Sequence, residues 1–97
     1  MPYVLIHRST QQVYTSVQVN HYGLAYYGVK FWPEEDEAMQ QHGAFLQSQE
    51  GIIADDWQVA EMEEAEMKLC NVKLKNDPKL QVYWTPARKP EIRKLEK

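Results

Sequence analysis

Short runs of β-branched and aromatic residues, separated by polar turns, dominate the first third of the chain. Residues 3–8 and 12–19 have this composition, and the polar residues 9–11 between them are the length of a tight connection. The turn-forming residues 20–23 precede residues 24–32, in which both sets of alternating side chains are mostly apolar. The pattern predicts a hairpin followed by a third strand at the centre of a sheet.

The period of the apolar positions changes after Trp32. Residues 34–50 begin with acidic side chains, which the positive end of a helix dipole favours, and Gly51 is a natural helix stop. Within this segment a mostly apolar stripe recurs at helical spacing, formed by Ala38, His42, Phe45, Leu46 and Gln49. We therefore predict the main helix over residues 34–50.

The second half of the chain adds two strands and a shorter helix. Residues 56–62 and 80–85 alternate in the way that half-buried strands do. Residues 63–70 are strong helix formers, whereas residues 72–75 alternate again. We predict a short second helix over residues 63–70 that runs into an extended piece.

Together these elements predict a small α+β fold, with a sheet of about five mostly antiparallel strands packed by the two helices. A chain of 97 residues can build one compact core and has no room for a second. Residues 1–85 are expected to form this domain. Residues 86–97 contain two prolines and five basic residues, so we expect a basic, flexible tail.

The cellular compartment is inferred from cysteine content and apolar runs. The single cysteine, Cys70, cannot form an internal disulfide, and small secreted domains usually depend on several. No apolar run approaches the roughly 20 residues that a membrane-spanning helix needs. The start of the chain, Met1-Pro2-Tyr3, lacks the features of a secretory signal. We expect a cytoplasmic protein with no membrane partner.

Charge is distributed unevenly behind the net value of −3. Residues 34–66 contain eleven acidic residues and no Lys or Arg, whereas residues 67–97 contain nine basic residues against three acidic ones. Such an uneven charge distribution gives information about the electric field of the protein and its binding partners, and little about its fold.

The acidic block suggests a surface that binds a protein. If its members share one face, their negative field can occupy a basic groove on another protein. The sequence therefore predicts a small interaction or regulatory module with these acidic candidates: Glu34, Glu35, Asp36, Glu37, Asp55, Asp56, Glu63 and Glu64. The plainer alternative is a solvated face that the basic third neutralises, within one copy or across a homodimer.

The C-terminal third carries the opposite hypothesis, binding of nucleic acid. Cations that neutralise phosphates and aromatic rings that stack on bases are the combination that binds single strands. The basic candidates are Lys73, Lys75, Lys79, Tyr83, Trp84, Arg88 and Lys89. Because the acidic block would repel phosphates, nucleic acid is the second choice after a protein partner.

Catalytic and cofactor motifs are hard to find in this sequence. The glycines are dispersed, so no phosphate-binding loop is recognisable, and the histidines and Cys70 lack the spacing of local zinc ligands. The neighbouring pairs Asp55-Asp56 and Glu63-Glu64 are acid or base candidates only if the fold turns them into one cleft. We expect a protein without cofactor, metal or catalytic site, and a small enzyme remains the third alternative.

One short string carries a resemblance. Residues 54–59, Ala-Asp-Asp-Trp-Gln-Val, resemble the closing strand of certain small proteins of Gram-positive phages. The resemblance covers six residues and implies an accessory protein of bacterial or phage type.

Overall fold

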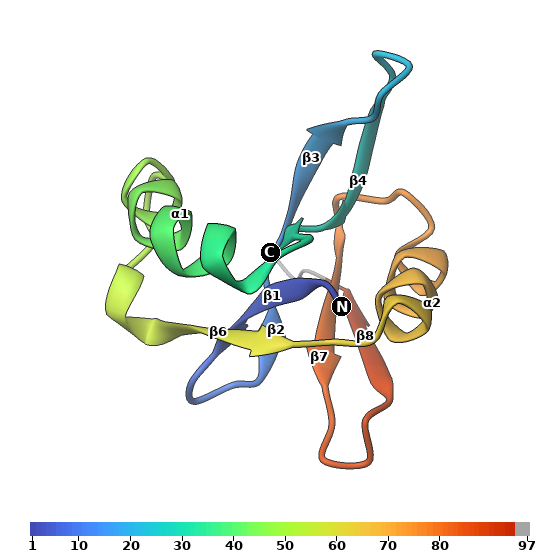
Figure 1. Ribbon diagram of the computed structural model, residues 1–97. Coiled ribbons are helices and arrows are strands. Elements are labelled where there is room, and N and C mark those ends of the chain that lie inside the picture. The colour runs from blue at the N-terminus through green and yellow to red at the C-terminus, as the bar shows by residue number, and fades with distance from the viewer. Residues whose placement is uncertain (95–97) are drawn as a thin grey trace.

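Strand β1 (Tyr3–His7) lies at the centre of the computed structural model, which describes residues 1–94 (Figure 1). Along one side, β6 (Trp57–Glu61) pairs with every residue of β1. The other side is shared, since β5 (Phe31–Trp32) pairs with the first half of β1 and β2 (Gln12–Val13) with the second half. All these pairings are antiparallel.

The sheet continues from β2 to β7 (Leu80–Trp84) and then to β8 (Pro90–Lys94), again with antiparallel pairing. Because β2 and β5 share one position beside β1, the six strands make a curled sheet five positions wide. The predicted α+β fold, with a mostly antiparallel sheet of about five strands, is confirmed.

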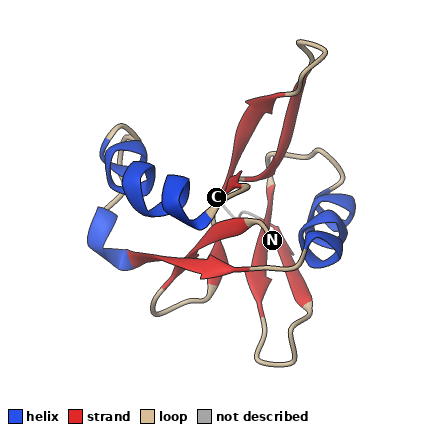
Figure 2. Ribbon diagram, viewed as in Figure 1, coloured by secondary structure: helices blue, strands red, loops and turns tan. Residues whose placement is uncertain are grey.

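Helix α1 (Glu35–Gln47) and helix α2 (Glu64–Leu74) lie on opposite sides of this sheet (Figure 2). The first confirms the main helix predicted over residues 34–50, and a short 3₁₀ turn (Ala54–Asp56) leads from it into β6. Within the described residues, neither helix is long and apolar enough to cross a bilayer.

The alternation of side chains along β1 divides the core into two halves. Val4 and Ile6 point to the side of α2, while Leu5 points to the side of α1. The α2 half also contains Met67, Cys70, Leu74, Val82 and Trp84, and the α1 half contains Tyr14, Trp32, Ala38, Leu46 and Trp57. Both halves therefore depend on β1.

A separate two-stranded ribbon, β3 (Thr15–Val19) and β4 (Ala25–Val29), projects from the body (Figure 1). The expectation of one central strand over residues 24–32 is wrong, because residues 25–29 belong to the ribbon and the chain returns to the main sheet only after Lys30. The expected strand over residues 12–19 divides at Tyr14 for the same reason.

The joint between sheet and ribbon is fixed by backbone hydrogen bonds. The amide of Tyr14 donates to the carbonyl of Leu5 at 2.9 Å, and the amide of Lys30 donates to the carbonyl of Tyr14 at 3.0 Å. The Lys30 ammonium group lies 4.9 Å and 4.8 Å from the ring centres of Trp32 and Phe45. Alternation alone does not reveal such a joint, because the pattern continues through it.

The expected extended piece over residues 72–75 is also wrong. These residues form the last turn of α2 and its cap, since Met67, Cys70 and Leu74 are buried at helical spacing. The helix ends at Lys75, which is in the left-handed region at φ 54°. A strand over residues 72–75 would place Val72 and Leu74 on the same face, but on the helix Leu74 is buried and Val72 is 70% exposed.

Part of the expected tail lies in the main sheet. Residues 90–94 form β8, because Ile92 packs against the core on the side of α2. A turn reverses the chain between β7 and β8, with Arg88 in the left-handed region at φ 58°. Prolines and cations dominate this segment, and Ile92 alone was too weak an apolar pattern to predict a strand from the sequence. Residues 95–97 of the expected tail lie outside the described residues.

If β1 holds both halves of the core, truncating Leu5 should be costly. Leu5 is fully buried, so we expect Leu5→Ala to lower the free energy of unfolding by about 2–5 kcal/mol. The control Val72→Ala, at an exposed helix position, should change it by less than about 0.5 kcal/mol. Urea unfolding of both variants measures the difference, and equal effects would contradict the central place of β1.

Candidate functional site

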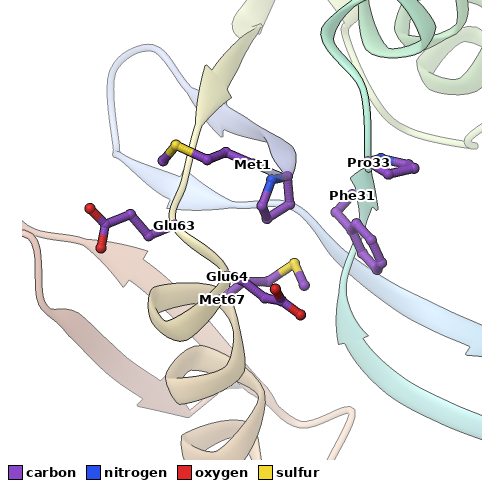
Figure 3. A pocket seen from close by; sticks show the side chains of 7 residues that line it. Met1, Phe31, Pro33, Glu63, Glu64 and Met67 are labelled. Carbon is purple, nitrogen blue, oxygen red and sulfur yellow. The ribbon is translucent and has the colours of Figure 1, made fainter.

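An open pocket of about 550 Å³ lies beside the start of the chain (Figure 3). Its apolar lining comes from Met1, Pro2, Phe31, Pro33 and Met67, and its acidic lining from Glu63 and Glu64. We call it the N-terminal pocket. Apolar walls with a few polar groups are typical of binding sites.

Three separate segments of the chain build the pocket. Residues 1–2 precede β1, residues 31–33 form β5 and the entry to α1, and residues 63–67 begin α2. The amide of Met62 donates to the carbonyl of Pro2 at 3.0 Å, which extends the pairing of β1 with β6 to the floor of the pocket.

Sheet register explains why these segments meet. Tyr3, at the start of β1, pairs with Trp32 at the end of β5 and with Glu61 at the end of β6. Helix α1 follows β5 and helix α2 follows β6, so both helices begin near the same end of β1. The acidic residues that favour helix starts are thereby brought to one pole of the molecule.

The Tyr3 phenol lies within this concentration of negative charge, and its pKa is raised. Its hydroxyl donates a hydrogen bond of 3.0 Å to Glu61, and this bond is the main reason that the pKa of Tyr3 is raised. Partial burial and the negative charges of Glu61, Glu35 and Glu34 raise that pKa further. Carboxylates from the start of α1 and from the end of β6 therefore act on the same place.

Glu63 and Glu64 line the pocket, whereas Glu34, Glu35 and Glu61 lie around Tyr3, which packs on the α1 half of the core. We define the acidic rim as these five carboxylates at one pole of the molecule. All five residues are exposed. Within residues 1–94, the salt bridge made by this rim joins Glu64 to Lys68 at 3.5 Å, and both side chains of that pair are well exposed. Exposed pairs of this kind contribute little, so most of the rim's charge is available to a ligand.

Glu66 behaves differently from the rim. Its carboxylate accepts a bidentate hydrogen bond from Arg88, 2.9 Å for the Nε contact, and a 2.9 Å bond from the amide of Glu63. The bond to Arg88 is the main reason that the pKa of Glu66 is lowered, and the backbone bond lowers it further. Arg88 thus ties the turn between β7 and β8 to the first turn of α2.

The remaining acidic candidates are divided. Asp36 and Glu37 are exposed in the first turn of α1. Asp55 and Asp56 lie at the opposite end of β6, where Asp56 is 3.9 Å from His7 and the carbonyl of Asp55 accepts a 2.9 Å bond from Arg8. The predicted acidic face therefore separates into the rim at one pole and an aspartate pair at the other.

The basic candidates do not form one surface. Lys73 and Lys75 are at the end of α2 with Lys79 in the following loop. Arg88 and Lys89 are in the β7–β8 turn, which the Arg88–Glu66 contact holds at the start of α2. The two groups are thus separated by the length of a helix of eleven residues.

The two aromatic candidates are already engaged. Trp84 is 8% exposed and belongs to the core beside α2. One face of the Tyr83 ring is covered by Arg93, whose guanidinium carbon is 4.0 Å from the ring centre. Trp84 is therefore not free to stack on bases in the way that single-strand binding requires, and Tyr83 has one face already occupied.

Sequence reasoning missed the apolar half of the pocket and one member of the rim. Met1, Pro2, Pro33 and Met67 carried no signal, because only the register of β1 brings them together. Glu61 belonged to the acidic block, but its contact with Tyr3 depends on pairing across 58 residues.

Metal binding and thiol chemistry find little support in the described part of the chain. Within residues 1–94, no three His, Cys, Asp or Glu side chains gather as a metal site would need. Cys70 is fully buried, and burial is the main cause that raises the pKa of its thiol to about 11. At neutral pH this thiol is protonated and therefore a poor nucleophile.

Comparison with known protein families, with curated proteins and with solved structures finds no match for this chain. The shape and charge of the pocket are therefore the basis for inferring its ligand.

Glu66 gives the site a testable dependence on pH. Its pKa in the folded state is below the ordinary value of 4.5, so the stability that it contributes is present at neutral pH. That contribution should fall as the pH drops below 4.5 toward the folded pKa. Gln can keep the backbone bond of the helix start but loses the charge that Arg88 binds. We therefore expect Glu66→Gln to cost up to about 1 kcal/mol at pH 7 and little in acid.

Urea unfolding between neutral and acidic pH measures this effect. Glu50→Gln is the matched control, because it removes the same charge from an exposed position that makes no salt bridge within the described residues. A difference between the two variants that stayed constant with pH would contradict the assigned role of Glu66.

Proposed function

We propose that this protein is a non-enzymatic interaction module that binds a protein partner through the N-terminal pocket and its acidic rim. The observation that carries the proposal is an apolar pocket whose lining includes Glu63 and Glu64, with the carboxylates of Glu34, Glu35 and Glu61 at the same pole of the molecule. We place the module in the cytoplasm and assign it a bacterial or phage origin, as the cysteine content and the short phage-like string favour.

Helix stability accounts for part of this arrangement but not for all of it. Acidic residues at helix starts interact favourably with the helix dipole, so Glu34, Glu35, Glu63 and Glu64 have a local reason to be there. That reason does not require an open apolar hollow between the two helix starts. The hollow adds the shape that a protruding side chain of a partner would fill.

The apolar lining and the nearby carboxylates indicate which kind of partner segment the pocket could bind. An aliphatic or aromatic side chain would enter between Phe31 and Met67, and neighbouring Lys or Arg residues would face the rim. Charge complementarity of this kind speeds association and selects partners more than it strengthens binding. The proposed ligand is therefore a peptide segment with an apolar anchor flanked by cations.

The nucleic-acid alternative has less support. Phosphates would be repelled by the rim, and the cations at the two ends of α2 do not form one continuous stripe. The burial of Trp84 and the Arg93 contact on one face of Tyr83 reduce the stacking surface that this alternative needs.

Selection from a random peptide library tests the proposal. Peptides that bind the wild-type protein should be enriched in one apolar residue flanked by Lys or Arg, and their affinity should fall with rising salt. The double variant Glu34→Gln/Glu63→Gln should weaken them at least about tenfold, equivalent to about 1.4 kcal/mol.

The double variant Glu50→Gln/Asp55→Asn is the control, since it removes the same number of charges away from the pocket. Isothermal calorimetry with one selected peptide compares the three proteins. Enrichment of peptides without basic residues, or equal weakening by both double variants, would contradict the proposal.

A further inference from the structure

The β3–β4 ribbon exposes apolar side chains that the body of the protein does not cover. On one face of β3, Val17 is 63% exposed and Val19 is 67% exposed. At the tip, Tyr22 and Leu24 are 77% and 64% exposed. Val17 and Val19 are neighbours on one face of the strand, and neighbouring exposed apolar residues, unlike scattered ones, mark interaction sites.

The two edges of the ribbon differ. The amide of Asn20 donates to the carbonyl of Leu24 and that of Lys30 to the carbonyl of Tyr14, so even-numbered residues make the hydrogen bonds between β3 and β4. Amides and carbonyls of odd-numbered residues therefore point outward from both edges.

On β4, side chains of α2 and of the loop after it cover the outward amides of Tyr27 and Val29. Asn71 accepts a bond of 2.9 Å from the amide of Val29, and Asn76 accepts one of 2.6 Å from the amide of Tyr27. On β3, no corresponding side chain within residues 1–94 bonds to the outward amides of Thr15, Val17 and Val19. The open edge of the ribbon is therefore β3.

The usual protection of an open edge is missing from β3. Natural proteins place charges, prolines or bulges on exposed edge strands to prevent pairing with another chain. Between Arg8 and Lys30 the sequence contains no Asp, Glu, Lys, Arg or Pro. An uninterrupted neutral edge with β-branched side chains is suited to pairing with another strand.

We propose that β3 pairs antiparallel with β3 of a second copy, which joins the two ribbons into one four-stranded sheet. A register centred on Val17 places Thr15 opposite Val19 of the second copy and overlaps the whole strand. In this register the outward amides and carbonyls of both copies face one another. Val17 and Val17 of the second copy lie side by side on the same face.

Charge favours a second copy as the occupant of this edge. A two-fold pairing places the residues of one β3 strand opposite those of the same strand in the second copy, and like charges directly opposite are destabilising. The uncharged edge avoids this penalty. Antiparallel pairing also directs the two bodies, each with a net charge of −3, to opposite ends of the joined sheet.

This interface is independent of the proposed function. The N-terminal pocket is lined by segments before β1, at β5 and at the start of α2, none of which belongs to β3. One strand edge is a small interface, so we expect a reversible dimer with a micromolar dissociation constant.

Sedimentation equilibrium across a range of protein concentrations tests the dimer. Val17→Pro removes one outward amide without removing a bond to β4, and Val17→Lys places charges opposite each other. Each should raise the dissociation constant at least tenfold while the circular dichroism spectrum stays that of the wild type. Val72→Lys, which adds the same charge at an exposed position of α2, should leave the dimer unchanged.

Crosslinking tests the register. Opposed residues of a hydrogen-bonded antiparallel pair have Cα atoms about 5.5 Å apart, inside the roughly 4.4–6.8 Å range of disulfides. Val17→Cys should therefore form a disulfide-linked dimer with oxidised glutathione, whereas Val72→Cys should not. Buried Cys70 contributes little background.

A wild-type protein that stays monomeric at high micromolar concentration would overturn the proposal. A dimer that is unaffected by both Val17→Pro and Val17→Lys would also overturn it. Peptide binding at the pocket would persist in either case, which separates failure of the dimer from failure of the proposed function.

Discussion

The two-sided burial of β1 is the constraint on which the rest of the structure depends. Val4 and Leu5 are fully buried although they point to opposite faces, so each face of the strand needs its own cover. In this protein a helix on each side provides that cover. The two core halves and the position of both helices follow from this requirement.

The same constraint creates the candidate site. Strands β5 and β6 flank the start of β1 and lead directly into α1 and α2, so two helix starts and the N-terminal segment converge on one pole. Acidic residues that stabilise helix starts are thereby concentrated beside an apolar hollow. The acidic rim forms because each helix favours acidic residues at its start and the strand pairing brings the two helix starts together.

The spacing of apolar residues predicted the helices and strands whose formation depends mainly on neighbouring residues in the sequence. The stripe that includes Ala38 and Leu46 predicted α1, and the alternation around Trp57 and Val82 predicted β6 and β7. The joint at Lys30, the helical state of Val72 and the pairing of β8 depend on contacts between distant segments. For the site, sequence identified several rim carboxylates, whereas Met67 and Pro2 join them only through the register of β1.

The most direct test of the proposed interaction site is a nuclear magnetic resonance titration of isotope-labelled protein. A peptide with one apolar residue flanked by lysines is compared with a single-stranded oligonucleotide. We expect the peptide to shift the amide signals of Phe31, Glu63 and Met67, and the oligonucleotide to leave them unchanged. Shifts caused by the oligonucleotide at Lys73, Lys79 and Lys89, with none at the pocket from the peptide, would contradict this account.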